Sequence, residues 1–222
     1  MTPVSRHIEV IRIPEPVRYT EMLERQRVRR DAVARGDAPN TLFVLQHTPV
    51  ITLGRKAKTE HVLHSAARLR EMGVERVETG RGGDVTYHGP GQLVAYPILN
   101  LAAWRRSVNW YLRALEEVLI GVLRDYGLGG ERVPGFTGVW VEGGKVAAIG
   151  IGVHQWVTFH GIALNVHPNM DHFGLIIPCG IAGKPVASME GLLGKAPSMS
   201  SVMDAFERRF LDYFSAASGE AG

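Results

Sequence analysis

Glycines and polar side chains are concentrated in one stretch of this chain, RGGDVTYHGPGQLVAY, which spans residues 81–96. Glycine permits positive φ and lets a ligand approach the main chain closely, so the five glycines between residues 80 and 91 indicate a tight backbone cradle. Arg81 adds a permanent charge and His88 a titratable ring. Loops with such mixed chemistry are more often binding loops than connectors, although a plain loop before a buried strand is the alternative.

The spacing of these glycines excludes two common phosphate-binding loops. It gives neither G-x-x-x-x-G-K-[ST] nor G-x-G-x-x-G, which sets aside a Walker loop and a dinucleotide fingerprint. The histidines give no convincing metal-ligand spacing, because His61 and His64 lie three residues apart without a third ligand nearby. We therefore expect no metal site and no cofactor, and the role of His160 stays open.

The one cysteine, Cys179, lies in the sequence Ile-Ile-Pro-Cys-Gly-Ile. A single thiol excludes a disulfide within the chain and fits a reducing compartment, where it is either a small buried apolar group or a nucleophile. The flanking proline and glycine fix a sharp local backbone geometry. Such a geometry costs free energy and is usually found where it positions a functional side chain. The residues alone leave both interpretations open.

Lys145 opens a predicted strand directly after two glycines, and the plain interpretation is an exposed lysine beside a hairpin turn. A lysine ammonium beside Cys179 would favour the thiolate, and the two groups could then share one proton. The separation of 34 positions along the chain does not show that the two residues meet.

Periodicity and turn residues predict a sequence of helices and strands that would position these groups. Strands are predicted over residues 7–13, 41–46, 50–53, 74–78, 93–101, 138–142, 145–153 and 156–166. Helices are predicted over residues 17–35, 62–72, 108–126 and 200–216. The tight spacing of 41–46 and 50–53 predicts a hairpin, and Gly143-Gly144 predicts another. The candidate cap of the last helix is Ser200 or Ser201.

Together these elements predict a mixed α/β (α+β) class, with a mixed and largely antiparallel sheet flanked by helices. No linker or repeat divides the chain, so we expect one domain over residues 1–222. Hydrophobic residues make up 45% and charged residues 21%, and no apolar run approaches the ~20 residues of a membrane helix. The first residues lack a signal-peptide pattern, which predicts a cytoplasmic protein, and a net charge of +3 is too small to indicate nucleic-acid binding.

Residues 81–97 closely resemble the signature RGGxxTxHGPGQLVxYP of the lipoyl(octanoyl) transferases, also called the lipoate-protein ligase B family. The chain departs from the commoner sequence at Asp84, where glutamine is more frequent. Three further segments resemble family elements: GGKVAAIGIGV, WVTFHGIALNV and PCGI. The resemblance extends from the first strand to Ser188 and implies the fold of the biotin and lipoyl protein ligases.

The resemblance also implies the residues of the site. Cys179 would be the acyl-accepting nucleophile and Lys145 the catalytic lysine. The substrate-binding residues that it implies are Arg81, Gly82, Gly83, Asp84, Val85, Thr86, Tyr87, His88, Ala148, Ile149, Gly150, Gly161, Ile162 and Ala163. In the two strand segments of this set, small residues would leave room for a straight acyl chain, although close packing of a helix on the sheet also explains them.

By the same resemblance, the chain would move an octanoyl group from octanoyl-acyl carrier protein to a lysine of lipoyl domains through a cysteine thioester. The acceptors would be lipoyl domains of 2-oxoacid dehydrogenase complexes and the glycine cleavage H protein, with no need for ATP. Two alternatives remain at this point. An ATP-dependent lipoate or biotin protein ligase would share the fold, and a non-catalytic acyl-binding module would need only the slot.

Overall fold

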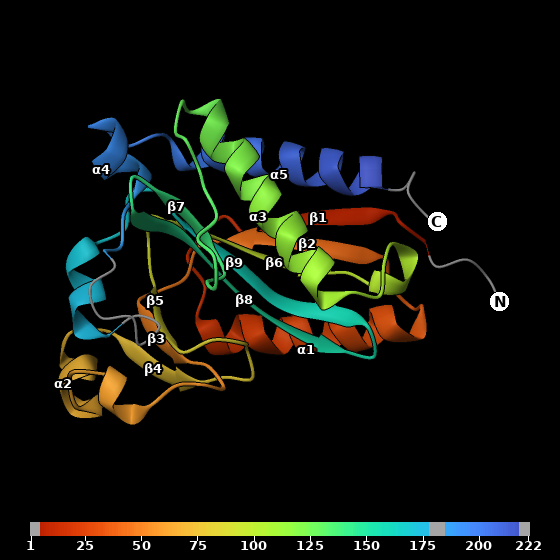
Figure 1. Ribbon diagram of the computed structural model, residues 1–222. Helices are drawn as coiled ribbons and strands as arrows, with labels where there is room; N and C mark the ends of the chain where they lie inside the picture. The colour runs from red at the N-terminus through yellow and green to blue at the C-terminus, as the bar shows by residue number, and fades with distance from the viewer. Residues whose placement is uncertain (1–4, 178–184, 218–222) are drawn as a thin grey trace.

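A six-stranded sheet and a three-stranded sheet form the framework of the protein (Figure 1). The structure is a computed structural model and describes residues 5–177 and 185–217. The strands are β1 (Ile8–Arg12), β2 (Asn40–Leu45), β3 (Val50–Leu53), β4 (Glu75–Glu78), β5 (Val85–His88), β6 (Gln92–Ile98), β7 (Val139–Val141), β8 (Gly144–His154) and β9 (Val157–Asn165). The helices are α1 (Tyr19–Arg35), α2 (Ala66–Glu71), α3 (Val108–Asp125), α4 (Met189–Leu193) and α5 (Met199–Ala216), with short 3-10 turns at Thr59–His61, Leu101–Ala103 and Met170–Leu175.

The large sheet has the strand order β1-β2-β6-β9-β8-β7. Only β1 and β2 pair in parallel, and every other neighbouring pair in this sheet is antiparallel. The small sheet, β4-β3-β5, combines one parallel and one antiparallel pair. The predicted class, a mixed and largely antiparallel sheet flanked by helices, is therefore confirmed.

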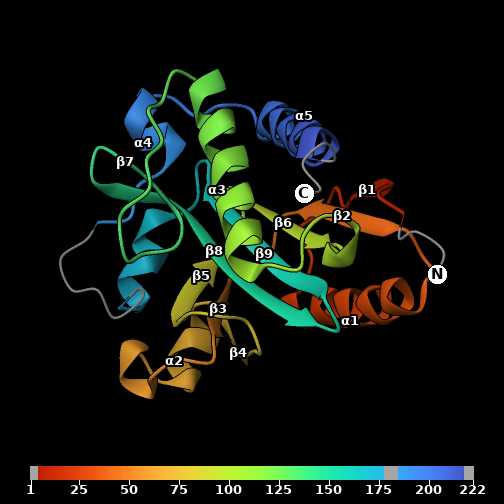
Figure 2. The ribbon, with the colours of Figure 1, turned by 45° about the vertical axis from the view of Figure 1, so that its right-hand side comes forward.

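Helix α1 covers one face of the large sheet, and α3 and α5 cover the other (Figures 1 and 2). The α1 stripe Tyr19, Met22, Leu23 and Val33 packs into a core with side chains of β2 and β6. The helix ends at Gly36, whose φ of 81° is a left-handed conformation that glycine adopts without steric cost.

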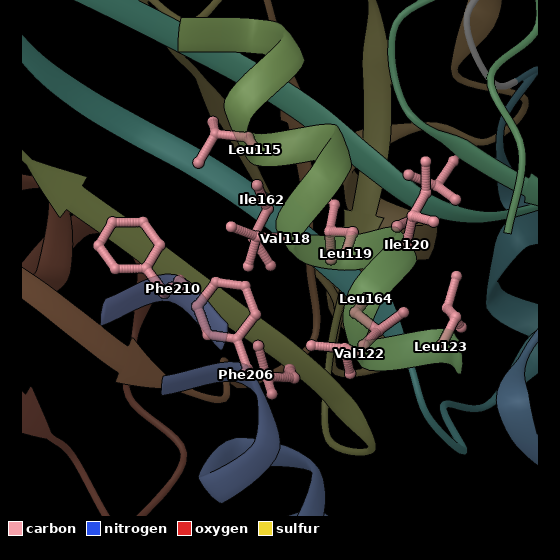
Figure 3. Packing of buried hydrophobic residues seen from close by; sticks show 14 of the residues in the cluster. Leu115, Val118, Leu119, Ile120, Val122, Leu123, Ile162, Leu164, Phe206 and Phe210 are labelled. Atoms are coloured by element: carbon pink, nitrogen blue, oxygen red, sulfur yellow. The ribbon is translucent and has the colours of Figure 1, made fainter. Parts of the chain in front are cut away.

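The larger core lies between the sheet, α3 and α5. Figure 3 shows side chains of α3, the strand residues Ile162 and Leu164, and the α5 residues Phe206 and Phe210 meeting in this core. Helix α3 is capped by the preceding residue Ser107, whose Oγ accepts a hydrogen bond from the Trp110 amide at 3.2 Å. The apolar faces of α3 and α5 thus pack together on one face of the large sheet.

The predicted hairpin between residues 41–46 and 50–53 is wrong. β2 pairs with β1 and β6 in the large sheet, whereas β3 pairs with β4 and β5 in the small one. The connection is held by the loop before α1, since the Thr48 amide donates to the carbonyl of Val17 at 3.2 Å and the His47 ring contacts the same carbonyl at 2.8 Å. These contacts satisfy the polar groups that a tight turn would otherwise pair.

Several element boundaries also differ from the predictions. The helix predicted over 62–72 is shortened to α2, because Ser65 caps it through a hydrogen bond from the Arg68 amide. The last helix begins after Ser198, so Ser200 and Ser201 lie inside it and do not cap it. The strand predicted over 93–101 ends at Ile98. Among the described residues, no helix has both the length and the apolar character needed to cross a membrane.

Candidate active site

A cavity lies between the glycine-rich stretch and strands β8 and β9. Its lining residues are Tyr19, Arg81, Gly82, Gly83, Asp84, Val85, Thr86, His88, Tyr96, Lys145, Ala148, Ile149, Gly150, His160, Gly161, Ile162 and Ala163. Every described residue that the resemblance implied for the site is in this set except Tyr87. Cys179 lies outside the described residues.

Lys145 comes from the second residue of β8, and its side chain is half-buried, so the plain interpretation of an exposed hairpin lysine is wrong. The β7–β8 pairing shifts register by one residue, because Val139 pairs with Ala147 while Trp140 pairs with Lys145. The extra residue in β8 is Val146, and it lies in the α3-side core together with Ala147. Such a bulge reverses the alternation of faces, which places Lys145 on the cavity side with Ala148.

Two residues in and next to the neighbouring strand β7 accommodate the Lys145 side chain. A Cβ atom at Gly138 would lie 2.7 Å from Cε of Lys145, closer than real Cβ contacts come, so glycine at this position leaves room for the lysine. The Lys145 Nζ atom lies 5.0 Å from the centroid of the Trp140 ring, within the range of a cation–π contact. The lysine is therefore held from one side by an aromatic face.

The glycines of the cavity walls serve close approach between main chains. The Gly82 amide donates to the carbonyl of Ile151 at 2.9 Å, which ties the glycine-rich stretch to β8. A Cβ atom at Gly150 would lie 3.0 Å from the Gly82 oxygen, and one at Gly161 would lie 2.1 Å from the oxygen of Ala95. Close packing of a helix, the alternative weighed from sequence, does not account for these two glycines, because the atoms that crowd them belong to a loop and to strand β6.

Arg81 is buried, with 7% of its surface exposed, and it faces the small sheet. Its Nε donates to Oγ1 of Thr52 at 3.0 Å and its Nη2 donates to the Thr52 carbonyl at 2.7 Å, so the guanidinium binds the middle of β3. Its Nη1 donates to the carbonyl of Gly82 at 3.0 Å. These bonds make Arg81 an anchor for the glycine-rich stretch as well as a wall residue.

Two histidine rings and two tyrosine rings line the cavity together, those of His88, His160, Tyr19 and Tyr96. His160 has a φ of 57°, a left-handed conformation, and its amide donates to Oε1 of Gln26 at 2.7 Å. Burial, with the cations Arg81, Arg27, Arg30 and Arg55 in smaller roles, lowers the pKa of His160 to about 3. Its Nδ1 lies 3.3 Å from the Tyr19 hydroxyl, whereas its Nε2 has no hydrogen-bond partner in the described part of the chain.

The other two histidines of this region are also neutral near pH 7. Burial, followed by the neighbouring His47, lowers the pKa of His88 to about 3. Burial lowers the pKa of His47 to about 4. The rings of Tyr19 and His88 are stacked with centroids 6.1 Å apart, and His47 contacts the Tyr96 hydroxyl at 2.7 Å. The histidine rings that line the cavity are thus uncharged near pH 7.

A chain of side-chain hydrogen bonds links His88 to the strand of Lys145. The His88 Nδ1 lies 2.7 Å from Oε1 of Gln92, and Nε2 of Gln92 donates to Oδ1 of Asn165 at 2.8 Å. The amide of Asn165 donates to the carbonyl of Ala187 at 3.0 Å, and the Ala187 amide donates to the Lys145 carbonyl at 3.0 Å. The glycine-rich stretch and the backbone at Lys145 are therefore connected through buried amides.

Asp84 lines the cavity and connects it with the segment before residue 178. Its Oδ2 lies 2.6 Å from Nδ1 of His61, and its Oδ1 accepts a hydrogen bond from the Val85 amide at 2.8 Å. The His61 carbonyl in turn accepts a hydrogen bond from the Ile177 amide at 2.9 Å. This departure from the commoner glutamine therefore has its own partner in the chain.

Tyr87 is placed differently from its predicted role as a binding residue. It follows the alternation of β5 and packs in the core of the small sheet, where its ring contacts Phe173 and its hydroxyl lies 2.8 Å from Nδ1 of His172. Thr86 and His88 line the cavity from the opposite face of β5, as strand alternation requires, whereas Val85 shares the face of Tyr87 and reaches the cavity from the first position of the strand.

Some residues of the site were not predicted. Tyr96 falls within the RGGxxTxHGPGQLVxYP signature, so the sequence could have indicated it. Tyr19 and Gly138 belong to no motif, and only the folded chain brings them to the cavity and to Lys145.

Comparisons with known proteins identify the family of this chain. Residues 18–211 match the lipoyl protein ligase A/B catalytic domain family. The octanoyltransferase of Chloroflexus aggregans is 50% identical over 189 residues, which cover 84% of this chain and 86% of that one. The octanoyltransferase of Gloeobacter violaceus is 54% identical over 157 residues, which cover 71% of this chain and 68% of that one.

Solved structures resemble the chain in fold at low sequence identity. Lipoate-protein ligase A bound with ATP has a TM-score of 0.72 at 16% identity, covering 94% of this chain and 85% of that one. The biotin protein ligase of Aquifex aeolicus in complex with biotin and ATP has a TM-score of 0.56 at 13% identity, covering 96% and 72%. The predicted ligase-like fold is therefore confirmed. The family match over most of the chain and the identities near 50% show that this chain belongs to the octanoyltransferases of the lipoyl protein ligase A/B catalytic domain family, and that it is an acyltransferase.

Proposed function

We propose that this enzyme transfers an octanoyl group from octanoyl-acyl carrier protein to the ε-amine of a lysine in a lipoyl domain, through a thioester on Cys179. One observation carries the proposal: Lys145 lies on the wall of a cavity whose remaining lining is largely apolar or glycine. The acceptors we propose are the lipoyl domains of 2-oxoacid dehydrogenase complexes and the glycine cleavage H protein. A solved relative of the fold is a lipoate protein ligase of Thermoplasma acidophilum studied with its E2 lipoyl domain.

In the first half of the reaction, the Cys179 thiolate attacks the carbonyl carbon of the octanoyl thioester. A bond forms between this carbon and the Cys179 sulfur, and the bond to the phosphopantetheine sulfur breaks. Lys145 accepts the proton of the Cys179 thiol and then donates it to the departing thiolate. The products are octanoyl-Cys179 and the free thiol of the carrier.

In the second half, the neutral ε-amine of the acceptor lysine attacks the same carbonyl carbon. A carbon–nitrogen bond forms, the bond to the Cys179 sulfur breaks, and Lys145 takes the proton that the amine loses. Exchange between two thioesters is nearly neutral in free energy and the amide is more stable than a thioester, so the sequence of steps needs no ATP. The free thiol or thiolate of Cys179 is restored.

The connectivity of the chain supports a position for Cys179 beside Lys145. Ile177, two residues before Cys179, donates a hydrogen bond to the carbonyl of His61, whose ring lies beside Asp84 of the cavity. On the other side, the carbonyl of Pro185 accepts a hydrogen bond from the Lys145 amide at 2.9 Å. Both described flanks of residues 178–184 are therefore attached next to the cavity.

The length of the cavity wall is compatible with an eight-carbon chain. Gly150 lies five positions after Lys145 on β8, which corresponds to roughly 16 Å at ~3.3 Å per residue. Burying the seven carbons beyond the carbonyl would contribute on the order of 5 kcal/mol at about 0.8 kcal/mol per CH₂. The rings of Tyr19, Tyr96 and His160 would then limit the chain length that fits.

The experiment that tests the proposal is intact-protein mass spectrometry after incubation with octanoyl-acyl carrier protein in the absence of ATP. We expect an octanoyl adduct that disappears when a lipoyl domain is added, with the acyl group recovered on the domain. Cys179→Ala should give neither the adduct nor transfer. Transfer that requires ATP and free octanoate would instead identify an ATP-dependent ligase, and binding without an adduct would identify an acyl-binding module.

We also propose that the enzyme works in the cytoplasm. The support is chemical, because a mechanism through a free Cys179 thiol requires a reducing compartment.

A further inference from the structure

A second cavity, of about 470 Å³, adjoins the first one at Lys145. Six residues line both: Gly82, Gly83, Asp84, Lys145, Ile149 and Gly150. The second cavity continues outward to residues 55–56, to the start of α3 and to the loop 135–137. A ligand in this space would therefore reach Lys145 past residues that do not line the first cavity.

Two cations stand in the outer part of the second cavity. Arg55 and Lys56 are both exposed, and within residues 5–177 and 185–217 neither side chain makes an ion pair. Their backbone positions are fixed, because the Arg55 amide donates to the Arg81 carbonyl at 3.1 Å and the Lys56 amide donates to the Gly83 carbonyl at 3.0 Å. Gly54 permits this approach, since a Cβ atom there would lie 2.4 Å from the Gly83 oxygen.

The rest of the second cavity is mostly uncharged. Val108 and Leu112 contribute from α3, and Phe136 contributes from the loop before β7. The carboxylate of Asp84 is the exception, and it is already engaged by His61 and by the Val85 amide. The cavity thus has an apolar middle, a cationic outer rim and Lys145 at its inner end.

The charges of the second cavity indicate which part of the two substrates it binds. The acceptor lysine is a short side chain that carries a positive charge in solution, so the cationic rim disfavours it. A second acyl slot would not need two cations without ion pairs. The donor thioester, in contrast, stands at the end of a long neutral pantetheine arm that ends in a phosphate diester, which matches the order of features in the cavity.

We propose that the second cavity binds the 4′-phosphopantetheine arm of the acyl donor, with its phosphate at Arg55 and Lys56 and its thioester at Lys145. This proposal rests on the octanoyl transfer proposed above and names the part of the donor that the enzyme recognises. Phosphate is also the charged group of a nucleotide, so the experiment includes ATP as a separate ligand.

The test compares donors with and without the phosphate. The donors are octanoyl-phosphopantetheine and octanoyl-pantetheine, and the enzymes are the wild type, Arg55→Ala/Lys56→Ala, and the control Arg70→Ala/Lys195→Ala. The control removes two exposed cations that also form no ion pair in the described part of the chain and that line neither cavity. The measured quantity is the ratio of kcat/KM for the two donors, with acylation of the enzyme followed by mass spectrometry.

We expect the wild type and the control to prefer the phosphorylated donor by the same factor. In Arg55→Ala/Lys56→Ala this preference should fall by about 10-fold or more, the effect of losing a charge-assisted hydrogen bond. An unchanged preference would overturn the proposal, and so would an equal loss with both donors. If ATP, measured by calorimetric titration, binds at this rim and phosphopantetheine does not, the site is a nucleotide site and the proposal is wrong.

The same experiment separates this inference from the proposed function. Titration of phosphopantetheine into the enzyme reports binding at the rim without any acyl transfer. Failure of every octanoyl thioester to acylate the wild type would contradict the proposed function, whatever the outcome of the titration. Acylation without a phosphate preference would contradict only the inference about the second cavity.

Discussion

Lys145 owes its position to features that carry no chemistry themselves. The register shift in β8 turns its side chain toward the cavity, Gly138 leaves room for its Cε, and the Trp140 ring lies under its ammonium. The carbonyl and amide of Lys145 both bond the described segment that follows residue 184. These contacts hold the ammonium group of Lys145 in one position relative to the cavity, whereas a freely rotating surface lysine has no fixed position.

The role proposed for this lysine predicts different outcomes for two substitutions. Lys145→Arg keeps the positive charge, but a guanidinium does not give up its proton and cannot act as a base. We expect transfer to fall by roughly 10²- to 10⁴-fold, the range of general acid/base catalysis, while iodoacetamide still alkylates Cys179 at near-neutral pH. Lys145→Met should lose transfer and shift alkylation to higher pH, because no cation favours the thiolate. An unchanged alkylation profile in Lys145→Met would remove Lys145 from the site.

At the scale of elements, strand β8 is the part of the sheet that carries the site. It pairs with β7 and β9 along its edges, and its Gly150 lies against the Gly82 carbonyl of the glycine-rich stretch. The hydrogen bond from the Gly82 amide to Ile151 fixes the same contact. The width of the cavity near Gly150 is therefore set by contact between two main chains.

This contact predicts that Gly150→Ala impairs acylation of the enzyme. The added Cβ would lie 3.0 Å from the Gly82 oxygen, so the glycine-rich stretch must shift by a few tenths of an ångström. We expect the KM for the donor to rise by about 10-fold, measured from the rate of adduct formation. Gly129→Ala is the matched control, since a Cβ there has open space around it. Equal kinetics in both variants would show that the contact does not shape the cavity.

Sequence patterns predicted most of the individual elements but not their distribution over two sheets. The strands around His47 each have the correct composition, yet their separation depends on contacts of the intervening residues with the Val17 carbonyl, which no local pattern encodes. Hairpin β7–β8 was predicted, although its turn is centred on Glu142 and Gly143, both with positive φ, one residue earlier than predicted.

The wall residues of the site could be predicted because they lie in long, specific motifs. The resemblance supplied Lys145 and the strand segments 148–150 and 161–163, and the cavity brings these together. Tyr87 lies inside the same motif but on the opposite face of β5, which a motif without a strand register does not reveal. Gly138 and Tyr19 act only through tertiary contacts, so no spacing in the sequence indicates them.

At the scale of the whole molecule, Arg81 joins the two sheets. Its guanidinium binds Thr52 of the small sheet, while the adjacent Gly82 bonds β8 of the large sheet. If the small sheet unfolded alone, this buried cation would lose its acceptors, and leaving a buried charge without partners is strongly unfavourable. The stability of each sheet therefore depends on the other.

We accordingly propose that residues 1–222 unfold as one domain, and calorimetry can test this. Differential scanning calorimetry should show a single transition whose calorimetric enthalpy equals the van't Hoff enthalpy. Two resolved transitions, or a calorimetric enthalpy well above the van't Hoff value, would show that the small sheet is an independent unit.

The buried histidines predict acid sensitivity. The pKa values of His88 and His160 are about 3 in the folded protein, below the unfolded value of about 6.5, so the unfolded chain binds more protons between these limits. Stability is therefore full above pH 6.5 and declines as the pH falls toward 3. Asparagine tolerates the positive φ of residue 160, and His160→Asn should reduce the slope of unfolding free energy against pH by up to about 1.4 kcal/mol per unit.

Urea unfolding between pH 4.5 and 7 measures this slope. His154→Asn is the control, because His154 is exposed. The prediction is wrong if the wild type and His160→Asn give parallel curves over this range.

The additional residue in β8 makes the site more sensitive to an insertion than to a deletion. Deleting Val146 would restore regular pairing with β7 and keep Lys145 opposite Trp140 on the face of Ala148, whereas inserting one residue before Val146 would turn Lys145 to the other face. An in-frame gain of one codon at this point would therefore be more damaging to transfer than the loss of one, although the loss removes a buried aliphatic side chain. The variant with one residue inserted before Val146 should lose transfer while retaining folded protein, and deleting Val146 from that variant should restore transfer.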